Sequence, residues 1–202
     1  MENLSLIVGL GNPGREYAKT RHNAGFIVCE LLAGRWRANW SFERKFSAQL
    51  ASAQRGTSRV LLCQPQTYMN SSGESVRAVV DFYQVSLSRL LVMVDDADLP
   101  LGSLRLRPGG SSGGHHGLES IEQQLGSREY ARLRIGIGRL EGERQLKGHV
   151  LGRFGSTESA LADKVFNVAA EQAETWLGAG IQKAMSQFNG NVDDSVNEGK
   201  EQ

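Results

Sequence analysis

The hydrophobic pattern of the chain predicts strands that alternate with helices. Short apolar runs rich in strand-forming residues are followed by segments whose apolar residues recur at helical spacing. Strands are expected at residues 4–8, 46–53, 59–64, 89–94, 104–107 and 132–138. Helices are expected at 26–36, 71–82, 118–125 and 156–188, the last weakened at Gly178 and Gly180. This order predicts an α/β fold with a mixed, mostly parallel, twisted sheet sandwiched between helices.

The length of 202 residues suits one domain with a sizeable buried core. After Asn189 the helical pattern ends and the sequence becomes polar. We therefore predict a single domain over residues 1–189 and a polar, disordered C-terminal tail over residues 190–202.

The first predicted strand opens directly into a glycine-rich turn. Residues 4–8 are apolar, and the sequence GLGNPG follows at residues 9–14. Open α/β folds bind ligands at the carboxyl ends of their strands. This turn and the polar segment after it are therefore expected to bring Asn12, His22 and Asn23 to a binding crevice.

The same glycines also satisfy the G-x-G-x-x-G pattern of dinucleotide-binding proteins. That pattern requires a helix to begin at its last glycines, so that backbone N–H groups meet the pyrophosphate. Pro13 lacks an N–H group and restrains Asn12 away from helical angles. The nearest acidic candidate for the ribose, Glu30, lies inside a predicted helix. A dinucleotide-dependent oxidoreductase is therefore disfavoured.

Composition adds little at the level of the whole chain. The net charge is +1, but the middle of the sequence is basic and its C-terminal part is acidic. This distribution fits either a local anion-binding face or solvated surface, and the counts do not separate the two. Cys29 and Cys63 lie in apolar runs typical of buried free thiols. With no leader and no membrane-spanning run, we expect a soluble, cytoplasmic protein without a membrane partner.

His22 is the best candidate for a general base, because its sequence neighbours are polar and an imidazole titrates near ~6.5. An ordinary loop or capping histidine is the competing interpretation. Asp95, after a buried strand, could accept a hydrogen bond from one ring nitrogen and fix the tautomer. No Ser or Cys lies in a nucleophile elbow, so water is the expected nucleophile.

Three further groups of residues have alternative interpretations. Asp95, Asp96 and Asp98 offer hard oxygen ligands for a divalent metal, although an acidic turn is the favoured interpretation. The adjacent His115 and His116 lack a zinc-binding spacing with His22. The arginines of two predicted strands fit either phosphate contacts or a solvated face. They are Arg105, Arg107, Arg132 and Arg134.

Five segments, in order, resemble motifs of bacterial peptidyl-tRNA hydrolases. The first is VGLGNPG at residues 8–14, with Tyr17 and TRHNAG at residues 20–25 after it. The others are PQTYMNSSG at 65–73, DDADLPLG at 95–102, GGHHGL at 113–118 and RLRIGIGR at 132–139. Together they extend over most of residues 5–155, which makes the resemblance specific.

The resemblance implies an enzyme that cuts the ester bond between a peptide and the terminal ribose of tRNA, freeing tRNA from aborted translation. It implies no metal and no cofactor. The implied partner is peptidyl-tRNA, through its acceptor stem and attached peptide, and we expect a monomer. By resemblance, His22 is the catalytic base and Asp95 orients it, while Asn12 and Asn70 hold the peptide and the neighbourhood of the ester. Met69 would pack beside the base.

The resemblance also assigns contacts with the RNA. Tyr17 would border the tRNA 3′ end, and the glycine loop would contribute Gly114, His115 and His116 as substrate- or tRNA-binding residues. Arg107 and Arg134 would take the place of a basic pair that clamps the 5′ phosphate, which suits the bidentate guanidinium group.

One position departs from the family pattern. His116 stands where the family usually has an Asn that is associated with the attacking water and substrate. An imidazole donates and accepts hydrogen bonds, but with a different reach and with a charge that depends on pH. We expect a working enzyme, because Asn12, His22, Asn70 and Asp95 are all present. A non-catalytic RNA-binding protein on the same fold, as recruited for splicing in chloroplasts, is the alternative.

Overall fold

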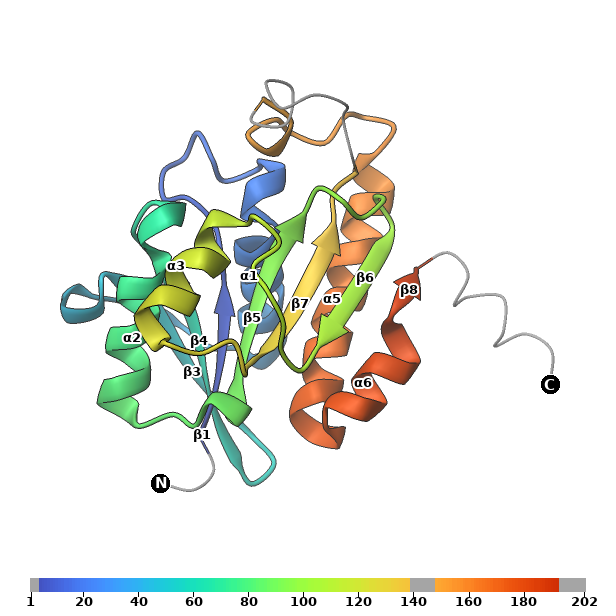
Figure 1. Ribbon diagram of the computed structural model, residues 1–202. Helices are drawn as coiled ribbons and strands as arrows, with labels where there is room; N and C mark the ends of the chain where they lie inside the picture. The colour runs from blue at the N-terminus through green and yellow to red at the C-terminus, as the bar shows by residue number, and fades with distance from the viewer. Residues whose placement is uncertain (1–3, 139–147, 193–202) are drawn as a thin grey trace, which may run out of the picture.

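The computed structural model describes residues 4–138 and 148–192, which form one eight-stranded sheet with helices on both faces (Figure 1). The strands lie in the order β2-β3-β4-β1-β5-β7-β6-β8. Their bounds are β1 Leu4–Gly9, β2 Trp40–Glu43, β3 Ala48–Arg55, β4 Ser58–Pro65, β5 Leu90–Asp96, β6 Ser103–Arg107, β7 Ala131–Gly136 and β8 Gly190–Asn191. The predicted α/β fold with a mixed sheet between helices is confirmed.

The four central strands, β4, β1, β5 and β7, are parallel, and the strands on either side of them are antiparallel. Every residue of β1 and β5 is buried, as expected for parallel strands covered on both faces. Because the central strands run in one direction, their carboxyl ends meet at one edge of the sheet. That edge receives the polar segments identified in the sequence.

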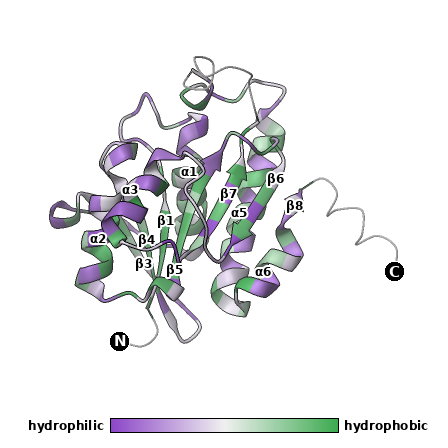
Figure 2. Cartoon of the chain, in the orientation of Figure 1, coloured by the Kyte–Doolittle hydropathy of each residue, from purple (hydrophilic) through white to green (hydrophobic). Residues whose placement is uncertain are grey.

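Two helical layers cover the sheet, whose central strands are largely hydrophobic (Figure 2). A cluster of buried apolar residues lies on each face of the sheet. One layer contains α1 Ala24–Trp36, α5 Ser159–Ala179 and α6 Ile181–Phe188, and the other contains α2 Ser72–Tyr83 and α3 His116–Leu125. Short 3₁₀ helices lie at Arg21–Asn23, Arg44–Phe46, Met69–Ser71 and Leu87–Arg89. In the described ranges, no helix combines the length and apolar character needed to cross a membrane.

The structure changes three details of the predicted elements. The long C-terminal helix is divided at Gly180, whose φ of 85° is left-handed, so that α6 turns back and packs near β6. The short edge strand β2 was not predicted. The domain also extends beyond residue 189, because β8 pairs with β6 and Val192 is buried. The remainder of the predicted tail, residues 193–202, lies outside the described residues.

Gly25 allows α1 to approach the sheet unusually closely. A Cβ atom at this position would lie 2.3 Å from the carbonyl oxygen of Met93 and 2.4 Å from the backbone nitrogen of Leu10. Both neighbours are backbone atoms of the sheet region and cannot move independently. The start of α1, and His22 just before it, is therefore positioned by a contact that only glycine permits.

We expect Gly25→Ala to destabilise the fold by about 3 kcal/mol, the upper end of the usual cost of overpacking. Gly34→Ala in the same helix is the matched control, because a Cβ atom there has no neighbour within 4 Å. It should be neutral or stabilising by up to about 1 kcal/mol. Urea unfolding midpoints measure both effects, and equal midpoints for the two variants would contradict the close-contact argument.

Candidate active site

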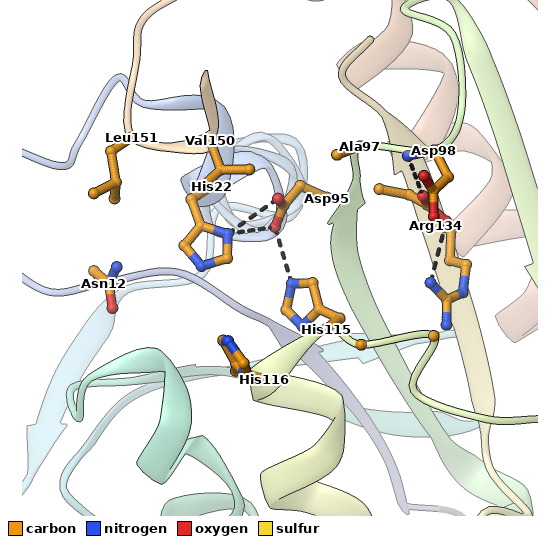
Figure 3. Close-up of a pocket in the computed structure, with 13 residues that line it drawn as sticks. Asn12, His22, Asp95, Ala97, Asp98, His115, His116, Arg134, Val150 and Leu151 are labelled. Atoms are coloured by element: carbon orange, nitrogen blue, oxygen red, sulfur yellow. Dashed lines mark hydrogen bonds and ion pairs between the residues drawn. The ribbon is translucent and has the colours of Figure 1, made fainter. Parts of the chain in front are cut away.

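A cavity of about 560 Å³ lies at the carboxyl edge of the parallel strands (Figure 3). It is lined by residues from the turn after β1, the 3₁₀ helix before α1, the end of β5 and the turn after it, β7, the glycine loop at the start of α3 and the segment around residue 150. Its polar and charged lining residues are Asn12, His22, Asp95, Asp96, Asp98, His115, His116 and Arg134. The sequence pattern thus predicted the edge at which most of these side chains meet.

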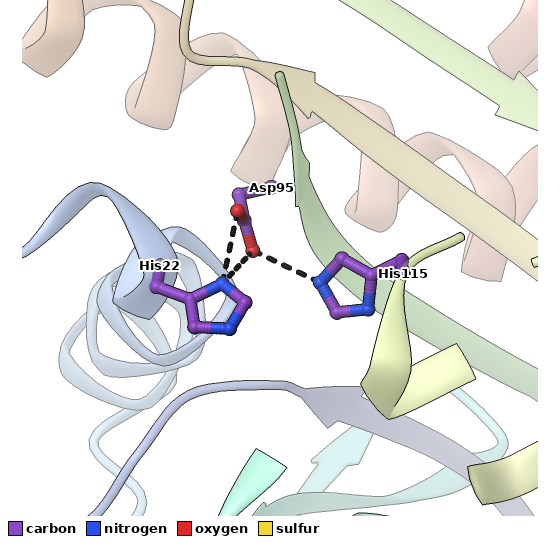
Figure 4. A group of neighbouring side chains, drawn as sticks. All are labelled: His22, Asp95 and His115. Atoms are coloured by element: carbon purple, nitrogen blue, oxygen red, sulfur yellow. Dashed lines mark hydrogen bonds and ion pairs between the residues drawn. The ribbon is translucent and has the colours of Figure 1, made fainter. Parts of the chain in front are cut away.

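His22 and Asp95 form the centre of this cavity (Figure 4). Asp95 is the penultimate residue of β5 rather than a residue after it, and it is only 2% exposed. The His22 Nδ1 atom lies 2.9 Å from Asp95 Oδ1 and 3.0 Å from Oδ2. A carboxylate accepts hydrogen bonds only, so Nδ1 carries the proton in the neutral ring and Nε2 has the free lone pair.

Burial and the carboxylate act on His22 in opposite directions. Burial of the ring lowers its pKa, but the charge of Asp95 and its hydrogen bond outweigh this effect, so the pKa lies above the ordinary 6.5. Burial likewise raises the pKa of Asp95, yet the charge of His22 and hydrogen bonds from His115 and His22 hold it well below its usual range. Asp95 therefore stays ionised at neutral pH.

His115 is a second partner of Asp95 and also caps α3. Its Nδ1 atom accepts hydrogen bonds from the backbone N–H groups of Gly117 and Leu118, at 3.2 and 3.3 Å. The proton of the neutral ring is therefore on Nε2, which donates to Asp95 Oδ1 at 3.0 Å. One buried carboxylate thus receives hydrogen bonds from two imidazoles.

The ring nitrogens of His22 and His115 and a carboxylate oxygen of Asp95 lie within 4.8 Å of one another, a spacing compatible with a metal ion. A metal would need a lone pair on His115 Nε2. Moving the proton to Nδ1 would set an N–H group against the two backbone N–H donors of α3. The hydrogen bonds therefore disfavour a metal among these residues.

The alternative cluster of three aspartates is also not assembled for a metal. Asp96 accepts a hydrogen bond from Arg134 at 3.1 Å and from the backbone N–H of Asp98 at 2.8 Å. Asp95 faces the two histidines instead. The carboxylates of Asp95 and Asp96 thus have different partners, in agreement with the preferred interpretation from sequence.

Asn12 is fixed by contacts on both its backbone and its side chain. Its backbone N–H donates to Asn23 Oδ1 at 2.9 Å, and Asn23 Nδ2 donates back to the Asn12 carbonyl at 3.0 Å. The backbone N–H of Met69 donates to Asn12 Oδ1 at 2.9 Å. The Asn12 amide therefore keeps its Nδ2 donor for the cavity. Residues 14–19 form turns rather than a helix, so the dinucleotide fingerprint lacks its phosphate-binding element.

The four arginines have different environments. Arg132 is 1% exposed and paired with Glu122 at 3.1 Å, so neither a phosphate contact nor a solvated face applies to this residue. Arg134 lines the cavity, where its guanidinium also donates to the carbonyls of Ser111 and Ser112. Arg105 and Arg107 are exposed on β6, on the same face of the sheet as Arg134. Arg105, Arg107 and Arg134 therefore form a basic face beside the cavity.

The remaining predicted site residues occupy three kinds of position. Gly114 and His116 line the cavity, and the His116 side chain is 77% exposed and bonded to Glu119 at 3.1 Å. Met69 is buried and contributes through its backbone. Asn70 is exposed and Tyr17 half-buried, and neither is among the lining residues.

Two apolar lining residues, Val150 and Leu151, were not identified from sequence. Their segment is held against the turn that carries His22, because the backbone N–H of Arg21 donates to the carbonyl of Gly152 at 2.9 Å. The Arg21 side chain also pairs with Glu158 at 2.6 Å. These contacts span more than a hundred residues, so no local pattern signals them. Arg139, at the end of the last motif, lies outside the described residues.

Comparisons with known proteins identify the family to which the chain is related. A family model described as peptidyl-tRNA hydrolase matches residues 6–197. A peptidyl-tRNA hydrolase from Synechococcus sp. (strain JA-2-3B'a(2-13)) is 47% identical over 92% of this chain and 83% of its own length. One from Bacillus cytotoxicus is 43% identical over 92% of this chain and all of its own length.

A solved structure is also similar throughout. The crystal structure of peptidyl-tRNA hydrolase from Acinetobacter baumannii superposes with a TM-score of 0.89 at 40% identity, covering 95% of this chain and 97% of that one. The resemblance seen in the five motifs is therefore confirmed, and the chain belongs to the peptidyl-tRNA hydrolase family.

Proposed function

We propose that this protein hydrolyses the ester bond between a peptide, or an N-blocked amino acid, and the 3′ ribose of tRNA. The observation that carries the proposal is the His22–Asp95 pair, in which the carboxylate holds Nδ1 and leaves Nε2 free in a cavity. Family membership supplies the substrate class. Recycling of tRNA from aborted translation is the corresponding role in the cell.

In the proposed reaction, His22 Nε2 takes a proton from water as the water oxygen bonds to the ester carbonyl carbon. The imidazolium that forms is stabilised by the Asp95 carboxylate, which is held in place by His115. The bond between the carbonyl carbon and the ribose 3′ oxygen then breaks, and His22 returns the proton to that oxygen. The products are a free peptide carboxylate and a tRNA 3′ hydroxyl group.

Asn12 is proposed to direct its Nδ2 donor toward the carbonyl oxygen, where negative charge develops in the transition state. Its amide cannot turn over without breaking the hydrogen bond from Met69. Asn70, exposed on the 3₁₀ helix that begins with Met69, is proposed to contact the peptide. Gly114, His115 and His116 would bound the substrate from the loop before α3.

The RNA is proposed to approach along β7 and β6. Arg134 at the cavity and Arg107 on β6 offer guanidinium groups for the 5′ phosphate, and Arg105 lies on the same face. Phosphate would compete with Asp96 for Arg134, because these two side chains are paired at 3.1 Å. Tyr17 is proposed to border the 3′ end of the RNA. Binding by these groups is expected to weaken as salt increases.

A non-catalytic RNA-binding protein would not need an oriented imidazole with a free Nε2 atom. Burying the Asp95 carboxylate between two histidines carries a desolvation cost. A role in RNA binding alone does not explain why the protein keeps such a charge there. The catalytic function is therefore favoured over this alternative.

We expect the protein to release the N-blocked amino acid from N-acetylated aminoacyl-tRNA at the same rate with and without a chelator. The proposed step uses only side chains and water, so metal removal should change the rate by less than about twofold. Release is measured as free tRNA after quenching. Tight tRNA binding without release would favour the RNA-binding alternative instead.

We expect His116→Asn to retain or raise the rate of ester hydrolysis. His116 is exposed, and its replacement removes only a surface contact with Glu119, worth at most about 1 kcal/mol. Glu119→Gln is the matched control, because it removes the carboxylate from the same contact and keeps the imidazole. A large loss in His116→Asn, with Glu119→Gln unchanged, would show that the imidazole itself takes part in this protein.

A further inference from the structure

A second cavity of about 270 Å³ lies beside Asn12, on the α1 face of the sheet. Gln49 and Gln64, which are directly paired across β3 and β4, form one wall. Phe26 of α1 and Trp40 of β2 form another. Asn12 lines both cavities. The smaller cavity is thus a neighbour of the active site rather than a remote feature.

The lining offers uncharged hydrogen-bonding groups. Its carboxylate, Glu30, is already bonded to Trp40 Nε1 at 2.9 Å and to Gln64 Nε2 at 2.9 Å. By contrast, the Gln49 side chain forms no hydrogen bond with any part of the chain that the structure describes. One amide donor and one amide acceptor match the N–H and C=O of a peptide group. Phe26 and Trp40 add apolar contact area.

The order of the strands places this cavity at the β3–β4 end of the carboxyl edge, away from the basic strands β7 and β6. Figure 1 shows β4, β1, β5 and β7 across the sheet, with β3 beyond β4 and β6 beyond β7. Gln49 and Gln64 lie on β3 and β4, Asp95 on β5 and Arg134 on β7. The proposed substrate has phosphates at one end, an ester in the middle and a peptide at the other end. With the ester at His22 and the phosphates toward β7 and β6, the peptide extends past Asn12 toward β4 and β3.

We propose that the second cavity is a subsite for the peptide segment upstream of the esterified residue, and that Gln49 binds its main-chain amides. This inference rests on the proposed function and names where the acyl part of the substrate lies. The volume is just below that of cavities for drug-sized ligands, about 300–1,000 Å³, and suits a residue-sized segment. Binding through main-chain groups admits peptides of different sequence.

The experiment compares kcat/KM for an N-acetylated tripeptidyl-tRNA with kcat/KM for a tRNA carrying one N-acetylated residue. The wild-type protein should prefer the longer substrate by about tenfold. Ala18→Trp places a large side chain at the exposed rim of the cavity, and Gln49→Leu removes the amide at constant size. Each should reduce the preference by about fivefold or more and change the short substrate by less than about twofold.

Ala179→Trp is the matched control, because Ala179 is exposed at the end of α5 and does not line the cavity. It should keep the wild-type preference. Equal rates for both substrates with the wild type, or an unchanged preference in both cavity variants, would overturn the subsite while leaving the proposed function intact. Hydrolysis of neither substrate by the wild type would overturn the proposed function and the subsite together.

Discussion

Replacing His22 with alanine is expected to lower kcat/KM for ester hydrolysis by about 10²–10⁴-fold, the usual contribution of a general base. The loss should be large because Nε2 is the lone pair that the Asp95 contact leaves free in the cavity. The measurement is release of the N-blocked amino acid from N-acetylated aminoacyl-tRNA, with chelator present throughout.

Added imidazole provides the control for His22→Ala. A small base that enters the vacated space should restore part of the rate, whereas damage to folding or to RNA binding would not respond to it. tRNA affinity should change little, because the arginines that are proposed to bind phosphate lie on β6 and β7. A variant that keeps more than about a tenth of the wild-type rate would rule out His22 as the base.

Asp95→Asn is expected to lower kcat/KM for ester hydrolysis by a similar factor, again about 10²–10⁴-fold. Asp95 accepts from both His22 Nδ1 and His115 Nε2. An amide in its place has one acceptor oxygen and one NH₂ group. Since His22 Nδ1 lies near both carboxylate oxygens, the new NH₂ group would donate to Nδ1 and move the ring proton to Nε2. The ring would then have no lone pair for water.

The pH dependence separates this effect from misfolding. In the wild type, burial lowers the pKa of His22, but the charge of Asp95 and its hydrogen bond have the larger effect, so the pKa lies above 6.5. Activity should therefore fall as the pH drops below that raised pKa. Asp95→Asn removes the charge, so the acidic limb of its residual activity should move to lower pH. Asp81→Asn, which alters only the exposed pair with Arg77 on α2, should keep the wild-type profile.

The His22–Asp95 pair also predicts how the stability of the fold depends on pH. A histidine whose folded pKa is raised stabilises the fold fully below its unfolded pKa near 6.5, and this contribution is lost as the pH rises through the folded value. Asp95→Asn should therefore remove a stabilisation that the wild type shows at mildly acidic pH. If unfolding midpoints of the two proteins keep a constant difference across this range, the two side chains are not coupled.

The sequence determined the elements and most of the residues at the active edge. Continuous apolar runs such as β5 predicted buried parallel strands, because both faces of such strands are covered by helices. Polar residues at the ends of those runs, including Asn12 and Asp95, then had to meet at one edge. Periodicity and strand direction are local properties, and they are readable without coordinates.

Only the tertiary structure decided which partner each polar group takes. Arg132 and Arg134 are two residues apart on one strand and look equivalent in the sequence, yet one is buried against Glu122 and the other lines the cavity. The proton positions on His22 and His115 follow from the carboxylate between them and from the start of α3.

Val150 and Leu151 reach the cavity through contacts with a turn more than a hundred residues away. Hydrogen bonds have many chemically equivalent candidate partners along a chain, and packing selects among them only when distant segments are brought together. The sequence therefore determined which groups arrive at the site, and the tertiary structure determined how they are protonated, paired and enclosed.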